Sequence, residues 1–325
     1  MTAKDNTGTK RPLIILTGPT AVGKTALSIG LAKAIQGEII SADSMQVYRG
    51  MDIGTAKITK EQMDGVPHHL IDIMDPSDSF HVMAFQQKCK EAMEDIYARH
   101  KIPILVGGTG FYIQSVLYDI SFTETDTDIE YRQELQKIAE EQGGYVLHAR
   151  LAKIDPEAAD EIHPNNVKRV IRALEFNHQT GEKISIHNEQ ERQKKSPYQF
   201  RYYVLSLPRE ILYDRINRRV DMMRRDGLVD EVKGLLQQGI TPNMVSMQGL
   251  GYKEIIDALQ GSCSFEEAFE RIKRETRHFA KRQFTWFRRE RDVTWIDKET
   301  YENEDAILQY MIEDLKNAYI LPADQ

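Results

Sequence analysis

Residues 18–25 constrain the fold of this chain more than any other segment. They read Gly-Pro-Thr-Ala-Val-Gly-Lys-Thr and match the phosphate-binding loop pattern G-x-x-x-x-G-K-[ST] at every defined position. The apolar residues 13–16 before the loop predict a buried strand, and residues 25–32 after it predict a helix. A strand, a glycine-rich turn and a helix in this order are typical of an α/β protein with a parallel sheet. The alternative is a glycine turn that arises by chance between a strand and a helix. Such a turn would need neither Lys24 nor the hydroxyl of Thr25.

The same loop predicts a chemistry, because its residue types favour an anion. The glycines let backbone N–H groups point at phosphate oxygens, and the N-terminus of the following helix adds partial positive charge. Lys24 adds a full charge, and the Thr25 hydroxyl is placed to hold a Mg²⁺ ion. The expected phosphate-binding residues are Gly18, Pro19, Thr20, Ala21, Val22, Gly23, Lys24 and Thr25. Many phosphate compounds bind such loops, so other residues must identify the ligand.

Short apolar runs alternate with helical segments along much of the chain. Further strands are predicted at residues 38–41, 102–106, 202–207 and 293–296, with a weaker candidate at residues 69–73. Residues 121–196 are polar and mostly helical in pattern. We therefore expect an α/β fold, a P-loop-containing parallel sheet flanked by helices, formed by residues 1–120 and 197–325. Residues 121–196 are expected to form a helical insertion domain.

Charge is unevenly distributed over the 325 residues. The formal net charge is −7, yet residues 271–291 hold nine Lys and Arg against two acidic residues. A concentrated basic segment on an acidic protein indicates contact with a polyanion. No apolar run approaches the ~20 residues needed to span a bilayer, and residues 1–11 lack the apolar core of a signal peptide. Two distant cysteines, Cys89 and Cys263, fit a cytoplasmic protein with reduced thiols.

A carboxylate, Asp43, follows the strand predicted at residues 38–41. In a parallel sheet we expect this position beside the phosphate loop of the first strand. The carboxylate is suited to accept a proton from an attacking nucleophile, and also to bind Mg²⁺ or to cap the next turn. Its position alone leaves these three roles open.

Two helices carry clustered cations. Arg215, Arg218 and Arg219 lie close together on one predicted helix. Three roles are open to them: a solvated basic face, stabilisation of a leaving phosphate, or contact with a phosphate backbone. Spacing does not choose among these readings. Residues 271–289 predict a second, long helix with a basic face for nucleic acid. Its Ile272, Thr276, Phe279, Gln283 and Trp286 recur with the spacing of a buried stripe, so we expect the aromatic rings in the core.

Taken in order, these motifs resemble those of the tRNA dimethylallyltransferases, also called tRNA isopentenyltransferases. Beyond the phosphate loop, the resemblance rests on residues 41–48, 51–57, 67–72, 107–112, 163–166, 169–175, 249–254 and 276–286. It covers nearly the whole chain, and the ordered series is far more specific than the loop alone. The zinc-finger extension of some eukaryotic relatives is not found in the sequence, so the bacterial type is expected.

This resemblance implies a reaction and a role for each residue. A dimethylallyl group passes from dimethylallyl diphosphate to the N6 amine of an adenosine adjacent to the tRNA anticodon. Asp43 is the implied base, and Lys24 and Arg219 stabilise the leaving diphosphate. Thr109 lies near the reacting groups, and Mg²⁺ on Thr25 is the implied cofactor. The adenosine must leave its stack to reach the loop.

The same resemblance implies that the partner is the tRNA anticodon stem-loop, gripped by the insertion and the basic helix of a monomer. The residues expected to line this contact are Asp43, Ser44, Met45, Gln46, Val167, Lys168, Arg169, Val170, Ile171, Thr276, Arg277, His278, Lys281, Arg282 and Gln283.

Two rival functions fit parts of the sequence. A nucleotide or small-molecule kinase shares the loop, but such kinases commonly have a strand ending in a Mg²⁺-binding Asp. Here the strand at residues 104–106 ends in glycines, and only Asp72, within the weak candidate strand, could serve. An RNA-binding module with a vestigial loop would need neither Asp43 nor the intact Lys24–Thr25 pair. His68, His69 and His163 lack a third ligand at metal-binding spacing.

Overall fold

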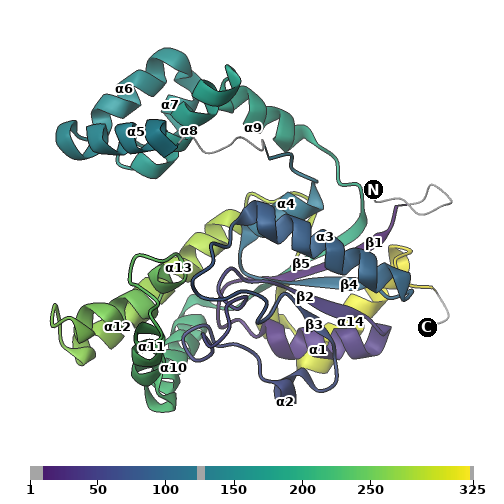
Figure 1. Cartoon of the computed structure of the whole chain (residues 1–325). Coiled ribbons are helices and arrows are strands. Elements are labelled where there is room, and N and C mark those ends of the chain that lie inside the picture. Colours follow the sequence, from purple (N-terminus) through teal and green to yellow (C-terminus); the bar gives the residue numbers. More distant parts are fainter. Residues whose placement is uncertain (1–9, 123–128, 323–325) are drawn as a thin grey trace. The chain divides into compact units, whose positions relative to one another are not determined.

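The computed structural model describes residues 10–122 and 129–322 and divides the chain into two compact units (Figure 1). The first unit comprises Met1–Leu117 and Pro197–Gln325, and the second comprises Tyr118–Ser196. The second unit therefore begins at Tyr118, whereas the sequence pattern placed the start of the insertion at residue 121. Of residues 1–11, which lack the apolar core of a signal peptide, only Lys10 and Arg11 fall within the described residues.

A six-stranded parallel sheet forms the centre of the first unit, which confirms the predicted α/β fold. Its strands are β1 Pro12–Thr17, β2 Glu38–Ala42, β3 His68–His69, β4 Pro103–Gly107, β5 Gln199–Ser206 and β6 Val293–Asp297. They lie in the order β3-β2-β4-β1-β5-β6, and each neighbouring pair is parallel. Residues 13–16 are all 0% exposed, as expected for a strand covered on both faces.

The weak strand candidate at residues 69–73 is wrong beyond its first residue, because β3 ends at His69. Leu70 and Asp72 both have left-handed backbone conformations, with φ of 63° and 55°. A β-strand requires negative φ at every side-chain-bearing residue, so the apolar Leu70 and Ile71 continue as a turn.

Helices cover both faces of the sheet (Figure 1). On one face α1 and α14 bury Leu27, Leu31 and Met311 against alternate strand residues. On the other face α3 carries a buried stripe that begins with Phe85 and Cys89. The helices of this unit are α1 Lys24–Ile35, α2 Lys60–Met63, α3 Val82–Ala98, α4 Gly110–Leu117, α10 Arg209–Asp226, α11 Leu228–Gln237, α12 Tyr252–Leu259, α13 Phe265–Phe287 and α14 Glu304–Asn317, with 3₁₀ turns η1 Ser246–Gln248 and η2 Lys298–Thr300.

The longest of these helices, α13, is the predicted basic helix. Its 23 residues begin at a capping box formed by Ser264 and Glu267, which satisfies the first backbone N–H groups of the helix. A hydrogen bond of 2.6 Å from Arg277 Nη1 to Asn217 Oδ1 joins α13 to α10. This bond joins the middle of α13 to the unit that carries the phosphate loop.

The second unit is helical and has a core of its own. It contains α5 Ile129–Gln142, α6 Gly144–Ile154, α7 Pro156–Glu161, α8 Val167–Thr180 and α9 Ile184–Gln193. Leu135, Leu147 and Leu151 pack with residues of α8 at its centre. The buried Glu175 accepts two hydrogen bonds from Arg132, of 2.5 and 2.8 Å, which join α8 to α5. Within the described residues of the chain, no helix is long and apolar enough to cross a membrane.

Candidate active site

The carboxyl ends of three central strands bring the sequence candidates to one edge of the sheet. Thr17 on β1 and Ala42 on β2 both align with Gly107 on β4. The residues that follow, Gly18 and Asp43, therefore leave the sheet at the same level, on either side of the glycine turn after β4. Asp43 was expected beside the phosphate loop, and it lies close enough for its charge to act on Lys24, although β4 stands between β1 and β2.

The phosphate loop has the backbone that its glycines predict. Gly18 has a φ of 141°, and a Cβ there would lie 2.6 Å from the carbonyl oxygen of Leu205, so only glycine fits. Gly23 is the N-cap of α1, which has no capping side chain. The first amide groups of α1 therefore remain available to an anion held in the loop.

Two cations converge on the loop. Lys24 Nζ donates hydrogen bonds of 2.9 Å to the carbonyl oxygens of Gly18 and Pro19. Although the residue is partly exposed overall, burial of its amine and the charge of Arg219 lower the pKa of Lys24 to about 7, while Asp43 opposes this shift. Arg219 Nη1 lies 3.4 Å from Thr20 Oγ1, and burial lowers the pKa of its guanidinium. A bound anion would stabilise the charged forms of both groups.

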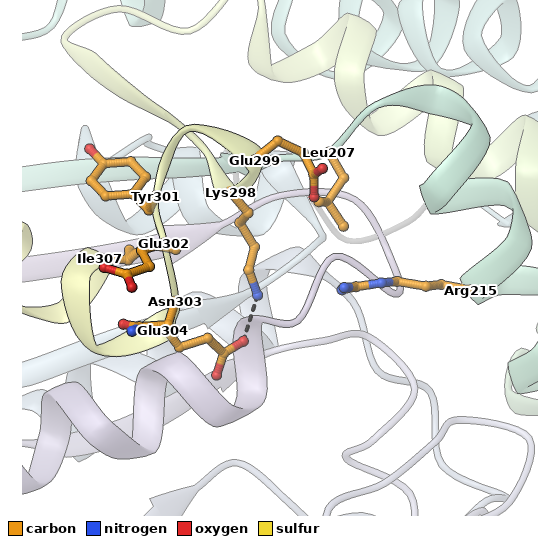
Figure 2. A pocket seen from close by; sticks show the side chains of 9 residues that line it. All are labelled: Leu207, Arg215, Lys298, Glu299, Tyr301, Glu302, Asn303, Glu304 and Ile307. Atoms are coloured by element: carbon orange, nitrogen blue, oxygen red, sulfur yellow. Dashed lines mark hydrogen bonds and ion pairs between the residues drawn. The ribbon is translucent and has the colours of Figure 1, made fainter.

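The structure separates the three arginines that the sequence left equivalent. Arg219 reaches the loop, whereas Arg218 forms a surface ion pair of 2.8 Å with Asp214. Arg215 points into a neighbouring cavity of about 340 Å³, where Lys298 and Glu304 form an ion pair of 2.6 Å (Figure 2). The cavity is lined by Leu207, Arg215, Lys298, Glu299, Tyr301, Glu302, Asn303, Glu304 and Ile307. Lys24, Asp43 and Arg219 do not line this cavity, but it abuts the phosphate loop, because a Cβ on Gly23 would lie 2.8 Å from Lys298 Nζ.

Asp43 caps the turn that follows β2. Its Oδ1 accepts hydrogen bonds from the backbone N–H groups of Met45, at 2.8 Å, and Gln46, at 3.3 Å. No hydrogen bond from the described residues reaches Oδ2. Capping holds the carboxylate in one orientation, and its second oxygen is suited to accept a proton from a ligand.

The glycine turn after β4 is tied to the phosphate loop by Gln283. Its Oε1 accepts a 2.9 Å hydrogen bond from Thr20 N, and its Nε2 donates one of 3.0 Å to Gly108 O. Gln283 is 6% exposed, so its side chain supports the two loops from α13. Thr109 is half-buried in the same turn, and its backbone N–H lies 3.4 Å from Ala42 O. The sequence contained no signal for the bridging role of Gln283.

The other candidates for RNA contact in the first unit differ in exposure. Ser44, Met45 and Gln46 are half-buried at the strand edge, and Gln46 Nε2 donates to Thr55 O at 3.2 Å. Of the candidates on α13, His278, Lys281 and Arg282 are exposed, whereas Thr276 and Arg277 are partly buried. Thr276 Oγ1 donates to Ile272 O at 2.7 Å within its own helix.

In the second unit the candidates occupy the first turns of α8. Lys168 and Arg169 are exposed, and Val167 is half-buried. Val170 and Ile171 belong to the core of the unit, with exposed fractions of 0% and 7%. Their side chains therefore support α8, and only its basic residues are presented to solvent.

Thr25 offers one hydroxyl oxygen to the magnesium ion that the loop pattern predicts. Thr25 is exposed at the start of α1. Nowhere in residues 10–122 and 129–322 do three His, Cys, Asp or Glu side chains form a group that could hold a metal. Mg²⁺ commonly takes one or two protein oxygens together with substrate phosphates and water, which suits a single hydroxyl beside an anion site. His68 and His69 instead contact Val66 O and Glu38, both at 2.8 Å.

Fold and loop together define the class of protein. A parallel α/β sheet with a glycine loop, an inward-facing lysine and an uncapped helix N-terminus has the features of a P-loop protein. The family model described as IPP transferase matches residues 46–290, and the model described as isopentenyl transferase matches residues 12–79. The chain belongs to the tRNA dimethylallyltransferase family.

Relatives of known name agree over almost the full length. A tRNA dimethylallyltransferase of Lachnoclostridium phytofermentans is 58% identical over 96% of this chain and 99% of its own, and one of Bacillus pumilus is 53% identical over 89% and 90%. The crystal structure of a tRNA isopentenylpyrophosphate transferase from Bacillus halodurans is 47% identical, with a TM-score of 0.70 over 95% of this chain and 98% of that one. A eukaryotic dimethylallyltransferase acting on tRNA is 31% identical, with a TM-score of 0.79 over 97% and 81%. The chain is therefore an enzyme, a transferase that modifies tRNA.

Proposed function

We propose that this chain transfers the dimethylallyl group of dimethylallyl diphosphate to the N6 amine of the adenosine adjacent to the tRNA anticodon, releasing diphosphate. The observation that supports this most strongly is the meeting of Lys24, Arg219 and Asp43 at one edge of the sheet. Two cations and a carboxylate match the needs of a departing anion and of an amine that must lose a proton.

The phosphate loop holds the leaving group. As the allylic C–O bond breaks, its electron pair goes to the diphosphate, and negative charge grows on those oxygens. Lys24, Arg219 and the first amides of α1 stabilise that charge, with the Thr20 hydroxyl as a further donor. Thr25 would hold Mg²⁺ against the diphosphate oxygens, where the ion supplies additional positive charge.

Asp43 acts on the nucleophile. The adenine amine attacks the allylic carbon, and the new C–N bond forms while the N6 proton passes to Asp43. The Asx turn to Met45 and Gln46 fixes the carboxylate before the substrate arrives. Since a stacked base cannot enter this edge of the sheet, the adenosine is extruded from the anticodon loop.

The anticodon stem-loop contacts basic side chains of both units. In the first unit these are His278, Lys281 and Arg282 of α13, and in the second Lys168 and Arg169 of α8. Their exposure and charge suit the phosphate backbone. The enzyme works as a monomer in the cytoplasm, where its tRNA substrate is available.

A transfer experiment tests this function directly. The purified chain is given tRNA with either labelled dimethylallyl diphosphate or γ-labelled ATP. We expect label in the RNA from the dimethylallyl donor only, and none with Lys24→Ala. Label arriving from ATP would identify a kinase instead, and RNA binding without transfer from either donor would indicate a binding module.

A further inference from the structure

Two aromatic side chains are exposed at the rim of the phosphate site. Phe111, the second residue of α4, is 42% exposed, and Trp286, in the last turn of α13, is 36% exposed. Their rings meet edge to face, with centroids 6.2 Å apart and planes at 70°. The helical spacing predicted Trp286 in the core. That prediction was wrong, because the neighbouring Phe287 fills the core position and is 0% exposed.

Both residues belong to the segments that build the catalytic edge. Phe111 follows the glycine turn that carries Thr109. Trp286 lies one helical turn after Gln283, which bonds to Thr20 N and Gly108 O. A Cβ on Gly110 would lie 2.2 Å from Trp286 Cδ1, so the indole closes directly over the turn. The aromatic pair is thus continuous with the phosphate site.

The charges around the pair suit a nucleotide. Exposed cations lie on the same helix and just beyond its end, at Lys281, Arg282, Arg288 and Arg289. Glu290 accepts the indole N–H of Trp286, and burial raises the pKa of its carboxyl to about 7. Near neutral pH this group therefore repels a polyanion less than an ordinary glutamate does. An apolar surface among cations is how proteins hold unpaired bases and their phosphates.

We propose that Phe111 and Trp286 form a stacking corner for an unpaired base of the anticodon loop, next to the adenosine that enters the phosphate site. This inference rests on the proposed function. Because the rings are nearly perpendicular, a base that stacks on one ring meets the other with its edge. When the adenosine is extruded, the bases next to it in the anticodon loop lose a stacking partner. The aromatic rings of the corner take the place of the lost adenine.

Tryptophan fluorescence tests the contact directly, because the chain has two tryptophans. Trp295→Phe leaves Trp286 as the reporter, and Trp286→Phe leaves Trp295. Trp295 is a matched control, since it is 39% exposed and already stacks on Phe284 at 6.2 Å. We expect an anticodon stem-loop RNA to quench Trp286 and not Trp295, and inorganic diphosphate to quench neither. RNA that binds without quenching Trp286 would overturn the proposal.

Substitutions at Phe111 provide a second test that does not depend on fluorescence. We expect Phe111→Ala to weaken binding of the stem-loop by about tenfold, with an unchanged KM for dimethylallyl diphosphate. Phe111→Tyr retains a ring and should restore the affinity. If Phe111→Ala binds RNA as tightly as the wild type, and the wild type still transfers the group, the proposed stacking corner is contradicted. Failure of the wild type to transfer the group would instead count against the proposed function.

Discussion

The phosphate site of the first unit and the basic surface of the second unit are built in different ways. The site joins segments that are far apart in the chain, among them residues 18–25, Asp43, Arg219 and Gln283. The candidates of the second unit, residues 167–171, lie consecutively on α8. A site assembled from distant segments depends on the whole sheet, whereas a surface on one helix depends only on that helix and its packing.

The two units also differ in how they are held together. Parallel pairing of β1 with β4 and β5 fixes the loop through a continuous buried ladder. The second unit relies on helix packing around residues such as Leu147 and Leu151. Contacts between helices that are close in sequence form and open more locally than a parallel sheet does. The chemistry of the first unit and the RNA contact of the second unit should therefore respond to mutation separately.

Replacing Asp43 should give the largest effect. We expect Asp43→Ala to reduce turnover by a factor of about 10²–10⁴ while tRNA binding stays largely intact, because the general base is lost. Asp43→Asn keeps an oxygen that can accept the N–H groups of Met45 and Gln46, but it cannot take a proton. Single-turnover rates and RNA affinities of both variants provide the measurement. Near-normal rates for Asp43→Asn would show that only the turn matters.

A mutation that creates a cavity in the core of the second unit should affect that unit without affecting the phosphate site. Leu151 is 0% exposed, so Leu151→Ala should destabilise this unit by about 2–5 kcal/mol. Hydrogen exchange should become faster in α5 to α8 and remain slow in β1, and calorimetry should show unchanged binding of inorganic diphosphate. Leu16→Ala is the matched control in the sheet core, where we expect diphosphate binding to weaken as well. Loss of diphosphate affinity in Leu151→Ala would contradict the independence of the units.

Most of the fold could be predicted because its signals are local. The run at residues 13–16 and the glycines of the loop specify a strand and a turn without any knowledge of the rest of the chain. The extent of β3 could not be predicted in this way. Leu70 is apolar like a strand residue, and its left-handed backbone becomes visible only in the structure.

The site was harder to predict where it depends on strand order. Sequence separation gave no indication that β4 lies between β1 and β2, so the sequence did not show that the turn after β4 stands between Asp43 and the loop. Helical spacing likewise placed Gln283 and Trp286 on one stripe, yet Gln283 is buried as a bridge and Trp286 is exposed. Periodicity identifies the face of a helix, but it does not identify where along that face the core ends.

A basic residue on α13 should produce a smaller effect that depends on salt. Lys281→Ala removes one exposed charge, so we expect several-fold weaker tRNA binding and a reduction of about one in the slope of log K against log salt. Turnover at saturating tRNA should remain unchanged. Lys60→Ala, at an exposed position on α2, is the control and should alter neither quantity. An unchanged slope for Lys281→Ala would place the RNA elsewhere.

The smallest predicted effect is the uptake of a proton by Lys24 when a diphosphate binds in the phosphate loop. In the free protein the pKa of Lys24 is lowered to about 7, so at pH 8 its amine is mostly neutral. A bound diphosphate favours the charged amine and raises this pKa, so binding at pH 8 takes up most of one proton. Affinity therefore falls as pH rises above about 7. Calorimetry of dimethylallyl diphosphate binding, repeated in buffers of different ionisation enthalpy, counts the protons.

Lys24→Arg is the matched variant for this measurement, because it keeps the positive charge and does not titrate in this range. Protonation of the ligand itself is common to both proteins and cancels in the difference. We expect the uptake at pH 8 to be smaller in the variant by most of one proton. Equal uptake in both proteins would mean that Lys24 is already charged in the free loop, and that the carbonyl oxygens of Gly18 and Pro19 outweigh the cost of burial.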